Sequence, residues 1–262
     1  MRILLNGAAG KMGRTMAAAI LAEPDLELAA AVDVDCLGQD AGQLAQGRDC
    51  GVVIEADLAA AIARTGPDAM LDFTNPASVL NNIRIALGAG LACVVGTTGL
   101  SQARLEELDV LARSRDTGLL VAPNFAISAV LMMRFAAEAV KYLPDYEIIE
   151  LHHDKKLDAP SGTALYTAQL MGENRLPHVQ GRLEESQELE GCRGGDYQGA
   201  RIHSMRLPGV VAQQQVVLAA PGQLLRISQE SANRDCFWPG VRLGLRRISA
   251  IKGLVYGLDK LL

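Results

Sequence analysis

The first 34 residues carry the feature that most restricts the fold of this chain. An apolar stretch at 2–6 predicts a strand, and three glycines within 7–13 break it. Apolar residues then recur at helical spacing until Pro24, and a second buried strand is expected at 26–34. Two strands joined by a helical crossover must pair in parallel. The start of the chain therefore predicts a βαβ unit.

The same alternation continues for another 90 residues or so, as expected of an α/β domain of ordinary size. Further strands are expected at 69–73, 91–95 and 119–122, with helices at 76–87 and 101–113. Aromatic residues make up only 4% of the chain, so the core must consist mainly of Ala, Leu, Val and Ile. This composition favours helices packed on a parallel sheet over a β-sandwich. The sequence predicts an α/β fold with a Rossmann-type, doubly wound parallel sheet.

The pattern changes after residue 123, where we expect a second domain. A long apolar helix is expected at 127–143. Beyond it we expect strands at 146–151, 201–207, 214–219 and 224–229, a helix at 163–172, and a mobile polar excursion at 184–199. Residues 239–262 return to helical spacing. We therefore expect one domain from residues 1–125 plus 233–262, and an α+β domain with a mixed sheet from residues 126–232.

Composition and charge restrict the partners and the cellular location. The formal net charge of the 262 residues is −5 and the basic residues are scattered, so nucleic acid is not an expected partner. The five cysteines are widely spaced, which is typical of reduced thiols in a cytoplasmic protein. No apolar run approaches the roughly 18 residues of a membrane helix, and no signal-peptide pattern is present, so no membrane association is expected.

The glycine-rich turn is a candidate dinucleotide site, since residues without a Cβ let a pyrophosphate approach the free N–H groups of a helix start. The spacing is G-x-x-G-x-x-G, which also occurs in purely structural turns. Asp33 ends the second strand, where a carboxylate accepts hydrogen bonds from the adenine ribose. It could also be a simple strand-end aspartate, and Asp35 could fill the same role. The expected cofactor-binding residues here are Gly7, Ala8, Ala9, Gly10, Lys11, Met12 and Asp33.

Two further loops follow expected parallel strands at their carboxyl ends, the edge where open α/β sheets bind ligands. Each could instead be an ordinary loop, but with the glycine turn they outline one crevice. Their expected cofactor-binding residues are Gly96, Thr97, Thr98, Ala122, Pro123, Asn124 and Phe125.

The segment 150–164 holds the densest chemistry. Two adjacent histidines, His152 and His153, precede Lys156, and a helix start is expected at Ser161. Such a cluster can bind an anion and deliver a proton. A surface histidine pair, a solvated turn and a capped helix start are the alternative interpretations. No third metal ligand stands at a usual spacing, so no metal site is expected.

Residues 7–13 (GAAGKMG) together with 150–164 (ELHHDKKLDAPSGTA) closely resemble the 4-hydroxy-tetrahydrodipicolinate reductase family, also called dihydrodipicolinate reductase, of lysine and diaminopimelate biosynthesis. Similarity also runs through GTTG at 96–99, APNF at 122–125, IHSMRLPGVVA at 202–212 and the end of the chain from 237. The resemblance implies NADH- or NADPH-dependent reduction of 4-hydroxy-tetrahydrodipicolinate to tetrahydrodipicolinate. It also implies a substrate domain whose sheet builds a homotetramer.

Carried onto matching positions, the resemblance makes His152 a proton donor or acceptor and Lys156 a second proton donor that also holds substrate. His153, Gly162 and Thr163 would contact the substrate, and Ser161 belongs to the same helix start. This assignment agrees with the residue chemistry. A small dicarboxylate needs a point charge for one carboxylate, and the N–H groups of a helix N-terminus suit the other.

The sequence departs from the family at a few positions. Lys11 stands where arginine is common, residues 213–215 read Gln-Gln-Gln where relatives often carry His-Gln-Glu, and 228–230 also differ. The alternatives are another Rossmann dehydrogenase of the aspartate pathway and a non-catalytic dinucleotide-binding sensor. The motif at 150–164 favours the reductase, because a sensor has no use for a dicarboxylate pocket.

Asp33 and Val34 lead to a prediction about the cofactor. A carboxylate suits the free 2′-hydroxyl of NADH and repels the 2′-phosphate of NADPH, and no arginine follows it. We expect NADH to be used at least as well as NADPH, in a comparison of kcat/KM for the two cofactors. A kcat/KM that strongly favours NADPH would contradict this, and would point to Lys11 or Arg14 as a phosphate ligand.

Overall fold

The computed structural model describes residues 1–182 and 184–262, which form two compact units. Unit 1 consists of Met1–Phe125 and Phe237–Leu262, and unit 2 of Ala126–Cys236. The chain thus returns to unit 1 at residue 237, whereas the sequence analysis placed this return at 233. Within the described residues, no helix has the length and apolar character needed to cross a membrane.

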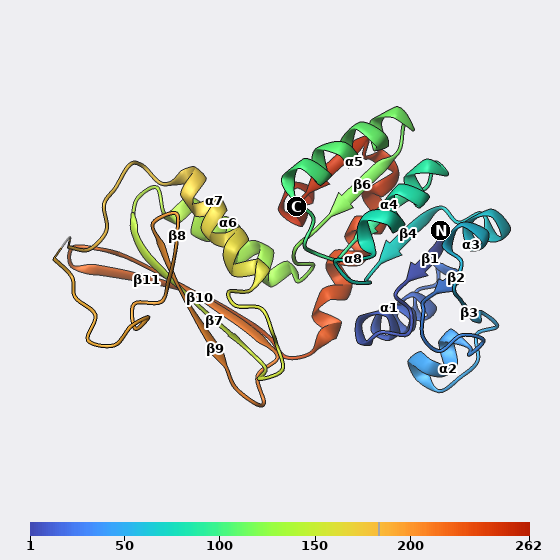
Figure 1. Ribbon diagram of the computed structural model, residues 1–262, viewed down its shortest axis with the longest axis horizontal. Coiled ribbons are helices and arrows are strands. Elements are labelled where there is room, and N and C mark those ends of the chain that lie inside the picture. The colour runs from blue at the N-terminus through green and yellow to red at the C-terminus, as the bar shows by residue number, and fades with distance from the viewer. Residues whose placement is uncertain (183) are drawn as a thin grey trace. The chain divides into compact units, whose positions relative to one another are not determined.

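Unit 1 is built around a seven-stranded sheet in which every neighbouring pair is parallel. Its strands, labelled in Figure 1 where space allows, are β1 (Arg2–Asn6), β2 (Glu27–Val32), β3 (Ile54–Glu55), β4 (Ala69–Asp72), β5 (Ala92–Val95), β6 (Gly118–Val121) and β12 (Gly253–Tyr256). Their order is β12-β6-β5-β4-β1-β2-β3. The strand order reverses between β1 and β4, so this doubly wound sheet has its ligand-binding crevice beside the end of β1.

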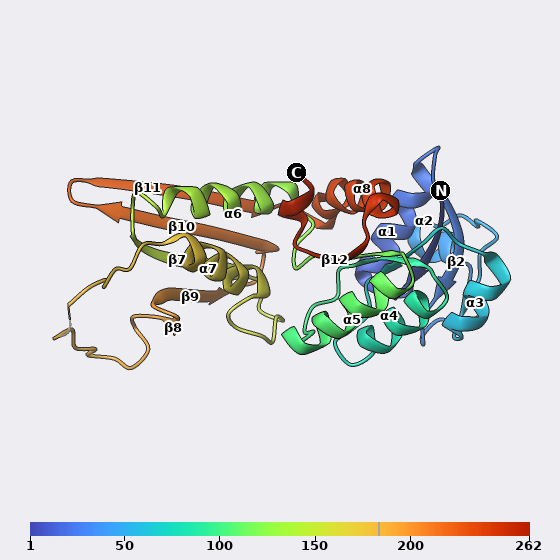
Figure 2. The same ribbon diagram turned by 90° about the horizontal axis from the view of Figure 1, so that it is seen from above.

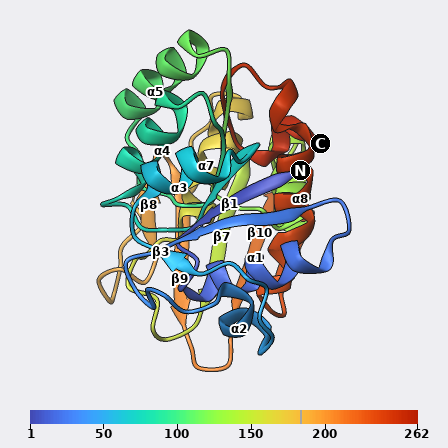
Figure 3. The same ribbon diagram turned by 90° about the vertical axis from the view of Figure 1, so that its right-hand side faces the viewer.

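Helices cover both faces of this sheet, as Figure 3 shows with α3, α4 and α5 on one side and α1 and α8 on the other. The helices are α1 (Lys11–Ala22), α2 (Ala41–Gln46), α3 (Leu58–Thr65), α4 (Val79–Gly88), α5 (Gln102–Ser114) and α8 (Trp238–Arg247). Because both faces are covered, the central strands are apolar throughout, and β4, β5 and β6 are almost completely buried. The predicted Rossmann-type sheet is confirmed.

Unit 2 contains a five-stranded mixed sheet in the order β11-β10-β7-β9-β8, as predicted. Its elements are α6 (Ile127–Ala139), β7 (Asp145–His152), α7 (Gly162–Asn174), β8 (Gly195–Tyr197), β9 (Ala200–Arg206), β10 (Ala212–Ala220) and β11 (Gln223–Ser231). Strands β7 and β9 pair in parallel, and the other neighbours are antiparallel. Helices α6 and α7 pack along the sheet (Figure 2), which explains the alternation of buried and half-buried residues in β7.

Several short elements differ from the expectation. The end of the chain is not helical throughout: α8 ends at Arg247, and β12 then pairs with β6. The expected excursion at 184–199 contains the start of a hairpin, since β8 pairs with β9; Leu183 lies outside the described residues. Strands of two to four residues, such as β3, β8 and β12, depend on a neighbouring strand for their hydrogen bonds, so their own sequence carries little signal.

Two helical glycines give a matched test of the packing. A Cβ on Gly240 of α8 would lie 2.0 Å from the backbone oxygen of Phe125, whereas one on Gly172 of α7 would meet no atom within 4 Å. We expect Gly240→Ala to lower the free energy of unfolding by about 1–3 kcal/mol through overpacking. Gly172→Ala should raise it by up to about 1 kcal/mol, because alanine favours helix. Urea denaturation measures both values, and a stabilising Gly240→Ala would contradict the described packing.

Candidate active-site residues

The glycine turn after β1 is shaped by close backbone contacts. Gly7 has φ +84°, and a Cβ on it would lie 2.4 Å from the backbone oxygen of Phe73. A Cβ on Gly13 would lie 2.0 Å from the backbone oxygen of Gly7. Both positions therefore require glycine, whatever the turn binds. Helix α1 begins just after Gly10, which has no side-chain cap, so its first N–H groups are available to a ligand.

Asp33, the residue after β2, lies against this turn. One carboxylate oxygen accepts a hydrogen bond from the backbone N–H of Ala9 at 2.8 Å. The other accepts from the N–H groups of Val34 at 2.7 Å and Asp35 at 3.1 Å. These hydrogen bonds fix the carboxylate beside the turn. Val34 is 83% exposed, so no side chain from that position covers Asp33.

A cavity of about 330 Å³ opens at the carboxyl edge of the sheet. The turn and the end of β2 line it through Gly7, Gly10, Asp33 and their neighbours, and residues 73–82 line the other side. A concave site with a free helix N-terminus and a carboxylate has the donors and acceptor that a dinucleotide needs. The expected residues at 96–98 and 122–125 do not line this cavity.

Phe73, which follows β4, holds the other expected cofactor loops in place. Its ring fills the space beside Gly96, where a Cβ would lie 2.1 Å from the ring. The same ring packs against Phe125, with 6.0 Å between ring centroids. Since its backbone oxygen also contacts Gly7, Phe73 touches all three loops that the sequence analysis singled out.

Buried polar residues at the ends of β1 and β4 belong to this site, and the sequence analysis missed them. Asp72 is fully buried and accepts hydrogen bonds from Asn6 at 2.9 Å, Thr97 at 2.8 Å and Asn82 at 3.1 Å. A signal was present: Asn6 and Asp72 are polar residues that end strongly apolar strands. Thr98, by contrast, is exposed, and its side chain makes no hydrogen bond with the described residues.

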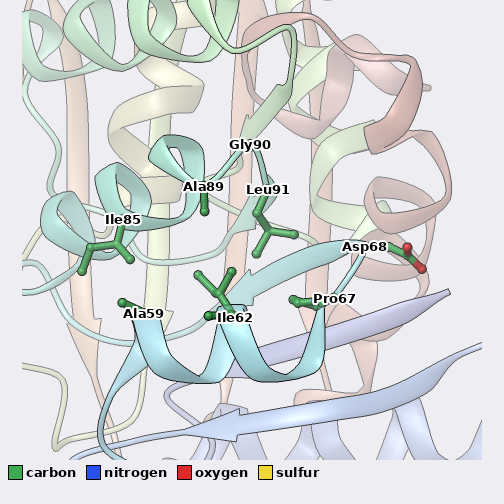
Figure 4. Close-up of a pocket in the computed structure, with 10 residues that line it drawn as sticks. Ala59, Ile62, Pro67, Asp68, Ile85, Ala89, Gly90 and Leu91 are labelled. Carbon is green, nitrogen blue, oxygen red and sulfur yellow. The ribbon is translucent and has the colours of Figure 1, made fainter.

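A second cavity of about 440 Å³ lies elsewhere on unit 1 (Figure 4). Its lining comes from α3, α4 and the segments that precede β4 and β5, among them Ile62, Ile85 and Leu91. These segments mark the amino ends of the strands. This second cavity therefore opens at the edge of the sheet opposite the glycine turn. Its lining contains none of the expected site residues.

In unit 2, His152 is the last residue of β7 and is hydrogen-bonded to a buried carboxylate. Its Nδ1 lies 2.5 Å from Oε2 of Glu150, whose side chain has no exposed surface. Arg206, on the neighbouring strand β9, donates two parallel hydrogen bonds to Glu150 at 2.9 and 3.0 Å. Burial by itself would raise the pKa of Glu150, but hydrogen bonds from His152, Arg206 and Ser204 hold it at about 2.

Lys156 lies in the loop after β7 and is paired with Asp158. Its Nζ donates to both carboxylate oxygens of Asp158, at 2.7 and 2.8 Å. Arg206 also donates to the backbone oxygen of Asp158 at 2.7 Å. A continuous set of contacts therefore links the two expected catalytic residues, from His152 through Glu150, Arg206 and Asp158 to Lys156.

The start of α7 is anchored to the same sheet. Ser161 caps the helix by accepting from the N–H of Ala164 at 3.2 Å. The backbone oxygen of Thr163 accepts from Thr167, whose hydroxyl accepts from Gln214 of β10, each at 2.7 Å. Gln214 is the register partner of Glu150, so these contacts tie the helix start to the strand that carries His152.

Two expected substrate residues at this site leave room for a ligand. A Cβ on Gly162 would meet no atom within 4 Å, so packing within the chain does not require glycine there. The side chain of His153 is half-buried and makes no hydrogen bond with the described residues, although its backbone oxygen accepts from the N–H of Lys156 at 3.1 Å. Within residues 1–182 and 184–262, no three His, Cys, Asp or Glu side chains are placed to hold a metal ion.

Comparison with known families accounts for the whole chain. The family model for the dihydrodipicolinate reductase N-terminus matches residues 1–125, and that for the C-terminus matches residues 128–262. The chain belongs to the dihydrodipicolinate reductase family. The junction between the two matches coincides with the start of unit 2 at Ala126.

Curated members of the dihydrodipicolinate reductase family are similar over their full length. The 4-hydroxy-tetrahydrodipicolinate reductase of Syntrophomonas wolfei is 46% identical over 100% of this chain and 98% of its own length. That of Moorella thermoacetica is 47% identical over 100% of this chain and 97% of its own. A solved dihydrodipicolinate reductase from Paenisporosarcina sp. TG-14, bound to dipicolinate, is 41% identical with a TM-score of 0.85, covering 100% and 99% of the two chains.

More distant structures share only the fold with this family member. An amine dehydrogenase from Mycobacterium smegmatis has a TM-score of 0.67 at 15% identity, over 99% of this chain and 95% of its own. The fold thus serves several dehydrogenases, so the site residues must carry the functional argument.

Proposed function

We propose that this chain reduces 4-hydroxy-tetrahydrodipicolinate to tetrahydrodipicolinate in lysine and diaminopimelate biosynthesis, with NADH or NADPH as the reductant. In the net reaction the substrate gains a hydride and a proton and loses one water. The observation that carries the proposal is the continuous set of contacts that links His152 to Lys156 through Glu150, Arg206 and Asp158 in unit 2. The full-length similarity to reductases of this name supports it.

The residues of unit 1 fit a dinucleotide. The bound cofactor supplies the hydride. We assign the pyrophosphate to the N–H groups at the start of α1, which follows Gly10 and has no side-chain cap. The Asp33 carboxylate, already held by the N–H of Ala9, retains acceptor capacity for a ribose hydroxyl. We assign residues 96–98 and 122–125 to the nicotinamide end, on the support of their contacts with Phe73.

The substrate assignment follows from charge. A dipicolinate-type ring carries two carboxylates, and dipicolinate is bound by the solved relative. The Lys156 ammonium can bind one substrate carboxylate, which then replaces the carboxylate of Asp158 as its partner. The N–H groups at the start of α7, from Ser161 to Thr163, suit the other, because the helix dipole is positive there. The open space beside Gly162 lets a carboxylate approach these groups, and His153 completes the proposed contacts.

Proton transfer is assigned to His152. Hydride addition leaves the conjugated ring with negative charge, and a group that titrates near neutral pH is needed to neutralise it. The imidazole of His152 can donate and accept a proton and is 17% exposed, whereas the side chain of its partner Glu150 has no exposed surface. Lys156 is the second proton donor in this proposal.

The alternatives expected from the sequence gain no support. An aspartate-semialdehyde dehydrogenase needs a reactive cysteine. None of the five cysteines lines the cavity at the glycine turn, and burial raises the pKa of the Cys93 thiol far above its usual range. A sensor would not need the contacts that link His152 to Lys156.

We further propose a cytoplasmic homotetramer, in which the uncovered face of the unit 2 sheet contacts other copies. Residues that alternate with the buried ones along the strands present apolar side chains there, among them Met205 at 43% and Leu224 at 51% exposed. Exposed apolar side chains on a sheet face suit contact with another copy of the chain. Light scattering should give four times the mass of the chain, and a monomer would contradict the proposal.

The proposed reaction can be measured directly. Aspartate semialdehyde and pyruvate are condensed freshly, and the fall in nicotinamide absorbance is followed with NADH and NADPH in parallel. Oxidation that requires protein, condensation product and cofactor together is the expected result. No oxidation with either cofactor, in a protein that binds the dinucleotide, would overturn the proposal in favour of the sensor.

The two catalytic assignments predict different kinetic losses. His152→Ala should lower kcat by about 10²–10⁴-fold without changing cofactor affinity, because it removes the proton donor. Lys156→Ala should lower kcat and also raise KM for the substrate by about 10–100-fold, since it removes a charged hydrogen bond. Lys155→Ala is the matched control, because the Lys155 side chain is exposed and makes no hydrogen bond or ion pair with the described residues. Near-normal turnover of either variant would remove that residue from the mechanism.

A further inference from the structure

We infer that Glu150 is a positioning residue for proton transfer by His152. Its carboxylate holds the imidazole in the tautomer that carries hydrogen on Nδ1 and leaves Nε2 for the substrate. The inference rests on the proposed function, since it assigns a partner to the proposed proton donor. Glu150 acts only through His152, because its side chain has no exposed surface.

The tautomer follows from hydrogen-bond chemistry. An ionised carboxylate can only accept hydrogen bonds, so the nitrogen that lies 2.5 Å from it must carry the hydrogen. That nitrogen is Nδ1 of His152. Its Nε2 has no hydrogen-bond partner among the described residues, and the side chain is 17% exposed. Nε2 is therefore the ring nitrogen left for a substrate.

Arg206 keeps the carboxylate ionised and fixed. Its guanidinium bonds to both oxygens of Glu150, and it also donates to the backbone oxygens of Met205 and Asp158 at 2.7 Å each. A bidentate pair of this kind restricts rotation of the carboxylate. The hydrogen-bonded groups hold the pKa of Glu150 at about 2, so the acceptor is charged throughout the working pH range.

Besides Glu150, His152 has an arginine, a neutral residue and an ion pair as neighbours on the adjacent strands and in the following loop. Arg206 is its register partner on β9, the neutral Ala212 is its partner on β10, and Lys156 and Asp158 form an ion pair in the following loop. When the imidazolium acts as acid, the Nε2–H bond breaks and a bond from that proton to the substrate forms. The Nδ1–H stays on the ring, Glu150 stays ionised, and water returns the proton to Nε2.

The opposite face of the same strand offers a matched control. Glu147 of β7 accepts from Nε2 of His203 at 2.7 Å and from Arg193 at 2.6 Å. It therefore has the same partner types as Glu150. Neither Glu147 nor His203 belongs to the proposed catalytic or substrate-binding residues; both lie on the face proposed to contact other copies, which is why the control must also keep the oligomeric mass.

The first test determines the tautomer of His152 by NMR in a protein that keeps Glu150. Protein labelled with ¹⁵N-histidine contains four imidazoles, and the His152 signals are those missing from His152→Asn. Above the titration of the ring, we expect a protonated Nδ1 and an unprotonated Nε2. An unprotonated Nδ1 with hydrogen on Nε2 would overturn the inference. This result does not depend on whether the proposed substrate is the true one.

The second test is the isosteric Glu150→Gln, compared with Glu147→Gln after both have been shown to keep the wild-type fold and oligomeric mass. For Glu150→Gln we expect kcat to fall by about 10–100-fold and KM to change by less than about two-fold, since substrate contacts remain. Its ¹⁵N spectrum should gain the Nε2–H tautomer, and Glu147→Gln should keep the wild-type kcat.

Failure of the positioning role can be distinguished from failure of the proposed function. Wild-type kcat in a folded Glu150→Gln, with an active wild-type enzyme, would overturn the positioning role alone. A wild-type protein that does not reduce the substrate would overturn the proposed function, and the tautomer measurement would still decide the state of His152. If Glu150→Gln does not fold, the wild-type tautomer decides the inference.

Discussion

The buried carboxylate of Glu150 is the interaction on which the rest of the unit 2 site depends. A carboxylate without solvent access needs charged and hydrogen-bonding partners, and removing one partner from such a pair is strongly destabilising. Arg206 and His152 supply those partners, and Arg206 extends the contacts to the loop that carries Lys156. The requirement to satisfy one buried charge thus determines where the proposed acid and the proposed substrate lysine lie.

Unit 1 depends on close packing rather than on charge. Phe73 contacts the glycine turn through its backbone and two further loops through its ring. A larger residue at Gly7 or Gly96 would displace it, so these glycines are needed for the architecture of unit 1. Beneath them, the buried Asp72 accepts from Asn6, Thr97 and Asn82, which joins the ends of three neighbouring strands.

Much of this could be predicted from the sequence, because long elements carry their own pattern. The βαβ start, the parallel sheet and the mixed second sheet followed from apolar periodicity, and the motif at 150–164 indicated the chemistry. The two-residue β3 and the terminal β12 could not be predicted, since tertiary pairing decides them. The role of Arg206 was also hidden. It lies 56 positions from Glu150 in sequence, and only the parallel pairing of β7 with β9 brings the two together.

The most direct test of the account is a crystal structure with NADH and dipicolinate bound together. The account predicts the pyrophosphate at the start of α1, a ribose hydroxyl on Asp33, one dipicolinate carboxylate on Lys156 and the other at the N–H groups of 161–163. It also predicts Nε2 of His152 facing the ring while Nδ1 remains on Glu150. Dipicolinate bound away from β7 and α7, or Nε2 turned away from it, would contradict the central claim.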